Sequence, residues 1–315
     1  MANSSVGTVA VPARRGISRQ RRRHIIEAYL FLTPWILGYL IFTAGPVVAS
    51  FVLSFTSYNV ISPPTFIGFG NYVEAFTTDK QFWPSLGKTF LYAGIGVPLG
   101  VTGSLIVALW LNVKVRGTSF FRTLFFMPSL VPIVASTVLW TWLLQPDWGI
   151  VNLLIWKLTG VQGPRWFESP DWALPGLITL SLWISIGGTR MIIFLAGLQG
   201  VPAEYYDAAS IDGAGAWARF RHVTLPMITP TVFLNLVLGI IGALQVFTSA
   251  FIATGGGPAY ATWFYALHIY KSAFSYFSMG YASALAWMFL IVILFFTWIQ
   301  FRMARHWVYY AGGEE

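Results

Sequence analysis

Long apolar stretches without charged residues dominate the chain and alternate with short charged segments. A transmembrane helix needs about 20 mostly apolar residues to cross the hydrocarbon core of a bilayer. Stretches of that length between charged residues therefore predict membrane spans, and the pattern predicts six of them. The expected spans are 29–54, 88–114, 122–147, 171–198, 225–251 and 279–301.

Two of these spans depart from a simple uncharged run. The uncharged stretch after His222 is too long for one helix, and the glycine-rich segment 254–258, which ends in proline, divides it. The span 171–198 carries Arg190, which we place near one end of the helix. The sequence thus predicts an all-α membrane protein with six transmembrane helices.

The composition agrees with a location in lipid. The chain is 56% hydrophobic and only 10% charged, whereas soluble domains are about 25% charged. The absence of cysteine excludes disulfides, thiolate metal sites and cysteine nucleophiles.

Lysine and arginine are distributed unequally between the two sets of loops. One set comprises the N-terminal segment, the loops after the second and fourth spans and the C-terminal tail. It holds 13 of these residues, namely Arg14, Arg15, Arg19, Arg21, Arg22, Arg23, Lys114, Arg116, Arg122, Arg219, Arg221, Arg302 and Arg305. The other set holds five, namely Lys80, Lys88, Lys157, Arg165 and Lys271. Because cytoplasmic loops carry the excess of basic residues, both termini are expected in the cytoplasm.

The net charge of +8 does not indicate a nucleic-acid-binding protein. The arginines lie at the mouths of membrane spans, where they oppose translocation and meet anionic lipid. The basic segment 1–27 is also too long to resemble a cleaved signal peptide, so the first span is expected to remain in the mature protein. We therefore expect membrane lipid as a partner and no nucleic acid.

The groups that catalysis or ion coupling needs are missing from the centres of the spans. None of the 11 acidic residues lies there, and the four histidines are too scattered for a zinc site. Ion-coupled carriers usually place an ionisable group inside the membrane, and this chain offers only Arg190. The sequence Gly87-Lys88-Thr89 resembles the end of a phosphate-binding loop, but Phe82 stands where that loop needs glycine. We expect no catalytic residue, metal or cofactor on this chain.

The loop between the fourth and fifth spans, 201–226, predicts a short helix that ends in a turn. Pro202 suits the first turn of a helix, and Glu204 lies near its positive end. Ala208 and Ala209 leave the helix with little bulk. Gly213 ends it or permits a turn that other residues resist.

A second amphipathic segment completes this loop. It carries Trp217 and Phe220 and leads to Leu225-Pro226 at the mouth of the fifth span. The loop therefore predicts a compact helix-turn-helix on the cytoplasmic face. The alternative is an interfacial helix whose aromatic side chains rest among the lipid headgroups.

The spacing of residues in this loop resembles the EAA loop of ABC-importer permeases. That pattern is an acidic residue, two alanines, a glycine and a terminal aliphatic-x-Leu-Pro, and the chain has it at Asp207, Ala208, Ala209, Gly213 and 223–226. Aspartate replaces glutamate at the first position, and valine replaces isoleucine near the last. The segments 201–206, 211–214, 254–258 and 280–285 further resemble the sugar-permease branch that includes the maltose and glycerol-3-phosphate importers.

The resemblance covers roughly 66–305 and implies the type I ABC importer permease fold. It implies a permease domain at 28–305 and a cytoplasmic tail at 306–315. The implied partners are a second homologous permease, a dimer of ATP-binding-cassette ATPases and an extracytoplasmic solute-binding protein. ATP and Mg²⁺ would bind to the ATPase, so this chain is not expected to be an enzyme.

In that family the EAA loop is the coupling helix, which sits in a cleft on the ATPase. The resemblance therefore assigns 201–226 as the coupling loop. The candidate coupling residues are Glu204, Tyr206, Asp207, Ala208, Ala209, Asp212, Gly213, Leu225 and Pro226.

A sugar is covered in hydroxyl groups, so its path needs amides, hydroxyls and aromatic faces. Spans three to five supply them, and by resemblance the family's mid-membrane site draws on these helices. The candidates are Ser129, Ser185, Gly187, Asn235, Gln245, Phe247 and Thr248. The alternative for each is interhelical packing, the ordinary use of small and polar residues in membrane helices. Gln245 is the strongest candidate, because a buried amide needs a partner that a sugar hydroxyl can supply.

Two other classes of protein have to be weighed. A membrane-embedded transferase would use Asp207 and Asp212 to hold Mg²⁺, but further acidic ligands are lacking nearby. A stand-alone secondary carrier would show an internal repeat and charges inside the membrane, and neither is visible in the sequence.

The charge bias between loops generates a topology prediction. A reporter fused after Glu315, or inserted near Gly215, should read cytoplasmic, and one inserted near Gly256 should read extracytoplasmic. Paired alkaline phosphatase and green fluorescent protein fusions measure this directly. An extracytoplasmic C-terminus would contradict the count of six spans.

Overall fold

The computed structural model describes residues 19–113 and 116–309. Most of the basic segment 1–27 and of the tail 306–315 lies outside these ranges. Within them the chain is mostly helical, with loops and the short antiparallel strands β1 (Thr56–Ser57) and β2 (Thr65–Phe66). The chain forms two compact units, Met1–Val52 and Leu53–Glu315.

The described part of the first unit is one long helical segment. Helix α1 (Arg19–Tyr39) passes through a π-helical turn (Leu40–Ala44) into α2 (Gly45–Leu53). The turn ends two residues before Pro46, whose ring does not fit against the preceding turn of a regular α-helix. Residues Arg22–Leu53 are long and apolar enough to cross a membrane, which agrees with the first expected span.

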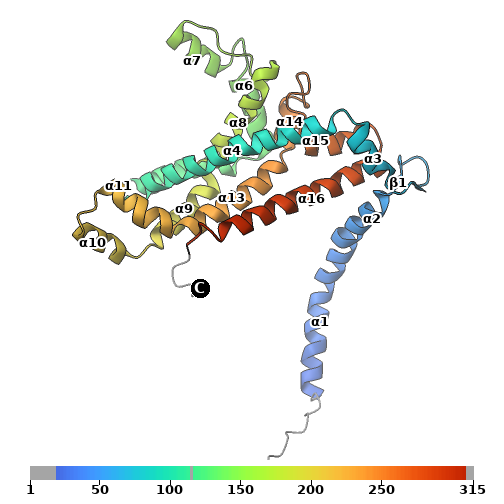
Figure 1. The fold of residues 1–315 in the computed structure, drawn as a ribbon, viewed down its shortest axis with the longest axis horizontal. Coiled ribbons are helices and arrows are strands. Elements are labelled where there is room, and N and C mark those ends of the chain that lie inside the picture. The colour runs from blue at the N-terminus through green and yellow to red at the C-terminus, as the bar shows by residue number, and fades with distance from the viewer. Residues whose placement is uncertain (1–18, 114–115, 310–315) are drawn as a thin grey trace, which may run out of the picture. The chain divides into compact units, whose positions relative to one another are not determined.

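The second unit contains the other helices (Figure 1). They are α3 (Gly70–Thr77), α4 (Phe82–Leu111), α5 (Thr118–Phe126), α6 (Ile133–Leu143), α7 (Ile150–Thr159), α8 (Pro170–Ser185), α9 (Gly188–Gln199), α10 (Ala203–Ile211), α11 (Ala216–Arg219), α12 (Leu225–Met227), α13 (Thr229–Leu244), α14 (Thr248–Ala253), α15 (Tyr265–Tyr270) and α16 (Met279–Ala304). A 3-10 turn (Met127–Leu130) follows α5, and π-helical turns (Phe220–Thr224 and Lys271–Ser275) follow α11 and α15.

Three segments of this unit are long and apolar enough to span a membrane, namely Phe82–Leu111, Thr229–Ala253 and Met279–Ala304. They correspond to the second, fifth and sixth expected spans. The second span begins ahead of Lys88, where the sequence analysis placed its limit. The reason is that the Lys88 ammonium donates a hydrogen bond to the carbonyl oxygen of Tyr260 (2.6 Å), so the charge is satisfied without ending the helix.

The third and fourth spans are bent pairs of helices. Thr118–Leu130 and Ile133–Leu143 meet at 97°, and Pro170–Ser185 and Gly188–Gln199 meet at 47°. The first bend lies between Pro128 and Pro132, which cannot donate helical hydrogen bonds. The second lies at Gly187. With each bent pair counted as one span, the described residues supply six, as the sequence predicts.

Helix α4 packs along α8, α9 and α13 (Figure 1). Val97, Val101 and Ala108 of α4 form a buried core with Met191 and Phe194 of α9. Helix α4 therefore lies against all three of these neighbouring helices.

Glycine allows the close approach between α9 and α13. A Cβ atom on Gly197 would lie 2.4 Å from the Thr231 hydroxyl oxygen. Small residues at such contacts are typical of helix pairs in membranes.

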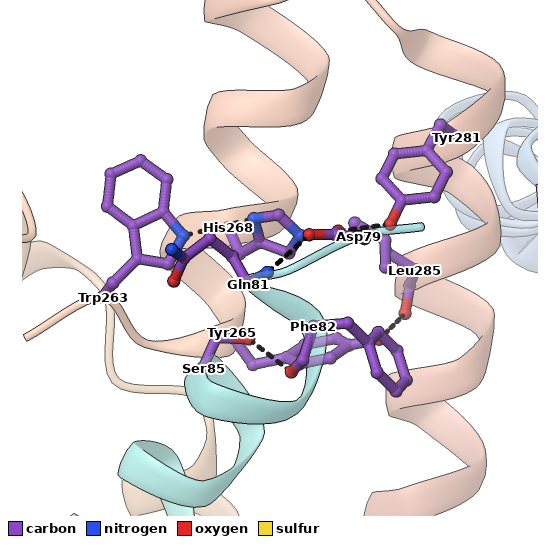
Figure 2. Close-up of polar contacts among 9 residues, drawn as sticks. All are labelled: Asp79, Gln81, Phe82, Ser85, Trp263, Tyr265, His268, Tyr281 and Leu285. Atoms are coloured by element: carbon purple, nitrogen blue, oxygen red, sulfur yellow. Dashed lines mark hydrogen bonds and ion pairs between the residues drawn. The ribbon is translucent and has the colours of Figure 1, made fainter. Parts of the chain in front are cut away.

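A buried polar cluster joins the start of α4 to α15 and α16 (Figure 2). The Trp263 indole N–H donates to Nδ1 of His268 (3.2 Å). Because the indole can only donate, Nδ1 is an acceptor and Nε2 carries the proton. Nε2 therefore donates to Oδ2 of Asp79 (2.6 Å).

The same carboxylate has further donors. The Tyr281 hydroxyl donates to Oδ2 of Asp79, and the Gln81 backbone N–H donates to Oδ1 (2.7 Å). Burial alone would raise the pKa of Asp79, but the hydrogen bonds from Tyr281, Gln81 and His268 outweigh burial and hold the pKa below its ordinary value. The ionised carboxylate thus holds together segments that lie far apart in the sequence.

The cluster predicts that His268→Ala lowers stability by about 1–3 kcal/mol, because it leaves the buried carboxylate short of a donor. Thermal unfolding of the reconstituted protein measures the effect. His24→Ala is the matched control, since His24 is exposed. Equal melting temperatures for His268→Ala and the wild type would show that the cluster does not stabilise the fold.

Asp79→Asn tests how the stability contributed by the Asp79 carboxylate depends on pH. Because the pKa of Asp79 is lower in the folded protein than in the unfolded chain, its charge stabilises the fold above about pH 4. That stabilisation is lost as the pH falls through the folded-state pKa. The difference in melting temperature between wild type and Asp79→Asn should therefore be large at neutral pH and shrink below about pH 4.

Candidate functional site

A cavity of about 300 Å³ lies between α4, α8, α9, α13 and α14. Its lining offers hydroxyl, amide and guanidinium groups together with one phenylalanine. The polar residues that line it are Tyr92, Ser181, Ser185, Arg190, Gln245, Thr248 and Ser249. Most of the remaining wall is glycine, alanine and branched aliphatic side chains.

A break in the fifth span builds one side of this cavity. Helix α13 ends at Leu244 and α14 begins at Thr248, so 245–247 is irregular backbone. Non-helical backbone at membrane depth is tolerated where it lines a cavity, because polar groups there can be satisfied. The Gln245 side chain is exposed and makes no hydrogen bond within the described chain, so its amide is available to a solute.

The cavity brings together four of the seven residues proposed for the solute path. Ser185, Gln245, Phe247 and Thr248 all line it. They come from α8 and from the break that leads into α14, segments that the sequence separates by about sixty residues.

The other three lie away from the cavity lining. The Ser129 hydroxyl donates to the Phe126 carbonyl (2.7 Å) inside the bend before α6. A Cβ atom on Gly187 would lie 1.8 Å from the Phe125 carbonyl oxygen, so Gly187 allows close packing. Asn235 is buried and donates to a carbonyl of its own helix. In this structure Ser129 and Gly187 serve the backbone and packing, whereas the buried Oδ1 of Asn235 has no hydrogen-bond partner within the described residues.

Arg190 is the cavity residue that the sequence analysis misplaced. We expected it near the end of the fourth span, but the bend at Gly187 brings it into the helix bundle on α9. A Cβ atom on Gly100 would lie 2.6 Å from Nη1 of Arg190, and one on Gly239 would lie 2.9 Å from Nη2. A straight helix over 171–198 would not place Arg190 at a cavity. A charged residue inside an apolar span was nevertheless a signal of a functional position.

The loop 201–226 is a compact helix-turn-helix, as predicted. Pro202 is the N-cap of α10 and does not lie in its first turn. At the other end Gly213 has φ +78°. The N–H of Ala214 bonds to the Ala209 carbonyl (2.9 Å) and that of Gly213 to the Ser210 carbonyl (3.1 Å), the pair of hydrogen bonds that defines a Schellman motif.

Side-chain hydrogen bonds fix the two arms of the loop to each other. The Tyr206 hydroxyl lies 3.1 Å from that of Thr224, and Arg219 donates to the Ser210 hydroxyl (3.2 Å). Ile211 lies beside the turn and is 88% exposed.

The candidate coupling residues divide by exposure. The exposed ones are Glu204, Asp207, Ala208, Asp212 and Gly213, and the partly buried ones are Tyr206, Ala209, Leu225 and Pro226. The loop therefore presents a nearly bare helix surface and its turn to the outside, while the hydrogen bond between Tyr206 and Thr224 joins its two arms.

The fold and these two sites define a polytopic helical membrane protein of the transport type. Residues 100–308 match the family model "Binding-protein-dependent transport system inner membrane component". The chain belongs to this family. The predicted permease role is thereby confirmed, and the chain is a transport subunit of the inner membrane rather than an enzyme.

Curated relatives and a solved structure agree with this assignment. The chain is 42% identical to the "Probable ABC transporter permease protein YesP" of Bacillus subtilis (strain 168), over 95% of this chain and 96% of that one. It is 32% identical to the "Lactose transport system permease protein LacF" of Rhizobium radiobacter, over 91% and 97% of the two chains. A bacterial alginate ABC transporter crystallised with a periplasmic protein shares the fold, with a TM-score of 0.80, 24% identity and coverage of 91% and 96%. The expected type I importer fold is confirmed.

Proposed function

We propose that this permease imports a sugar and that the cavity between α4, α8, α9 and α13 is its share of the translocation path. The observation that carries the proposal is the break between α13 and α14, which presents Gln245, Phe247 and Thr248 to the cavity. A relative of this chain is named for lactose transport, which supports a sugar as the solute.

The aromatic side of the cavity suits a sugar ring. Phe247 stacks on Phe251 with ring centroids 5.4 Å apart, and it contacts Tyr270 at 5.0 Å. These contacts hold the Phe247 ring in place at the cavity wall, where it offers apolar contact to the C–H groups of a pyranose. The neighbouring hydroxyls and the Gln245 amide supply hydrogen bonds for the sugar's own hydroxyl groups.

The partners follow from this role. A second homologous permease would complete the path, an extracytoplasmic solute-binding protein would deliver the sugar, and an ATP-binding-cassette ATPase dimer would bind ATP and Mg²⁺. The bias of basic residues supports an orientation with both termini and the loop 201–226 in the cytoplasm.

The chain connects the loop to the cavity through rigid elements. Helix α9 ends at Gln199 and α10 begins at Ala203, while α12 leads into α13 at Thr229. Both α9 and α13 line the cavity with Arg190 and Gly239. A displacement of the loop by an ATPase would therefore move two walls of the cavity directly.

Gln245→Leu tests the path. The variant should assemble normally and hydrolyse ATP but import its solute about tenfold more slowly, because leucine has a similar length and cannot form hydrogen bonds. Uptake into proteoliposomes measures the rate. Gln300→Leu is the matched control, since Gln300 lies on α16 outside the cavity lining. Unchanged uptake by Gln245→Leu would assign Gln245 to packing.

Gly213→Val and Ala209→Trp test the coupling role of the loop. Valine at φ +78° strains the turn by about 1 kcal/mol or more, and tryptophan adds bulk where the ATPase would approach. Both variants should insert into the membrane but lose ATPase subunits, or lose the stimulation of hydrolysis by loaded binding protein. Subunit retention and solute-dependent hydrolysis of the purified complex measure these effects.

Gly215→Val is the matched control for the turn. Gly215 has φ −67° and ψ 173°, which valine adopts without strain, and a Cβ atom added there would meet no other atom within 4 Å. It should retain most of the wild-type coupling. Wild-type association, stimulation and uptake in Gly213→Val and Ala209→Trp would show that this loop is not the coupling element.

A further inference from the structure

Two glycines at the cavity wall make room for one cationic side chain, that of Arg190. The Arg190 guanidinium lies between Gly100 of α4 and Gly239 of α13, and a Cβ atom at either glycine would approach it within 3 Å. Any larger residue at these positions would displace the guanidinium. Two helices distant in the sequence therefore leave room for the same charged group at the cavity wall.

The described chain does not neutralise this charge. No residue that lines the cavity is acidic, and the ion pairs among the described residues all involve other groups. A charge inside a membrane bundle is costly unless it is paired, and such residues usually face a partner or a pathway. The Arg190 charge is therefore available to an anionic group from outside the part of the chain that the structure describes.

A second polar group near the guanidinium also lacks a partner. The Ser185 hydroxyl oxygen is buried and makes no hydrogen bond in the described chain. A Cβ atom on Gly100 would lie 3.0 Å from this oxygen and 2.6 Å from Nη1 of Arg190, so both polar groups lie beside the same glycine of α4. A hydroxyl and a guanidinium that are neighbours at a cavity wall can donate to the two oxygens of one carboxylate.

We propose that Arg190 is a specificity residue and that the solute of this importer is an acidic sugar. The carboxylate of a uronic acid pairs with the Arg190 guanidinium, whose planar fork matches two carboxylate oxygens. Ser185 donates to the same carboxylate, while Gln245 and Thr248 bind the sugar's hydroxyls. The assignment rests on the proposed sugar-import function and narrows it to anionic sugars, because a neutral sugar would leave the guanidinium unpaired.

Competition between matched sugars tests the assignment. Proteoliposomes that contain the assembled importer and its binding protein are supplied with an equal mixture of neutral oligosaccharides, from starch and cellulose, and acidic ones, from pectin and alginate. Mass spectrometry of the vesicle contents then gives the ratio of acidic to neutral sugar imported. The wild type should import acidic sugars preferentially. Arg190→Gln should lower that ratio about tenfold or more, and Arg190→Lys should restore it in part.

Arg122→Gln is the matched control. It removes the same charge from α5, where Arg122 donates to the Leu111 carbonyl (3.0 Å) and does not line the cavity. Its ratio of acidic to neutral sugar should equal that of the wild type. Subunit retention is measured for every variant, because loss of the second permease in Arg190→Gln would show that Arg190 pairs with a carboxylate of that partner.

The outcomes separate this inference from the proposed function. Import of neutral sugars alone by the wild type would overturn the anionic assignment and leave sugar import intact. Import of acidic sugars at an unchanged ratio in Arg190→Gln would overturn the role of Arg190. If neither class enters while the complex hydrolyses ATP, the proposed sugar function fails as well.

Discussion

Close contact between helices through glycine is the constraint on which the larger unit depends. Gly187 lies against the Phe125 carbonyl, Gly197 against Thr231, and Gly100 against Arg190 and Ser185. In lipid the association of helices cannot draw on the hydrophobic effect, so it depends on packing and on hydrogen bonds between helices. The same contacts that hold α4 against α8, α9 and α13 therefore also determine which polar groups meet at the cavity.

The membrane spans could be predicted from the sequence, whereas their bends could not. Hydropathy and the spacing of charges report how much apolar chain is available. They do not report direction, so the bends at Pro132 and Gly187 were missed although both residues were visible. The position of Arg190 was wrong for that reason alone. The turn at Gly213, by contrast, depends on one residue and its immediate neighbours, and it was predicted correctly.

The rest of the site could not be predicted from the sequence, because it depends on contacts between segments that lie far apart in the chain. The Asp79–His268 pair joins residues 189 positions apart, and the cavity joins α4, α8, α9 and α13. No local pattern in the sequence marks either arrangement. Gln245 was named from its residue type and its place in an apolar span, and the structure places it at a helix break. Ser129 and Asn235 satisfied the same criterion and lie elsewhere, so residue type alone does not identify a lining residue.

The two ends of the larger unit differ in what surrounds them. At one end the ionised carboxylate of Asp79 connects the start of α4 to His268 and to Tyr281 of α16. At the other end α9 and α13 continue into the loop 201–226, where a Cβ atom added at the Gly213 turn would meet nothing within 4 Å. A force applied to the loop would therefore move α9 and α13 relative to a fixed end of α4. Since Arg190 lies on α9 and contacts both α4 and α13 through glycines, such a movement would change the geometry around its charge.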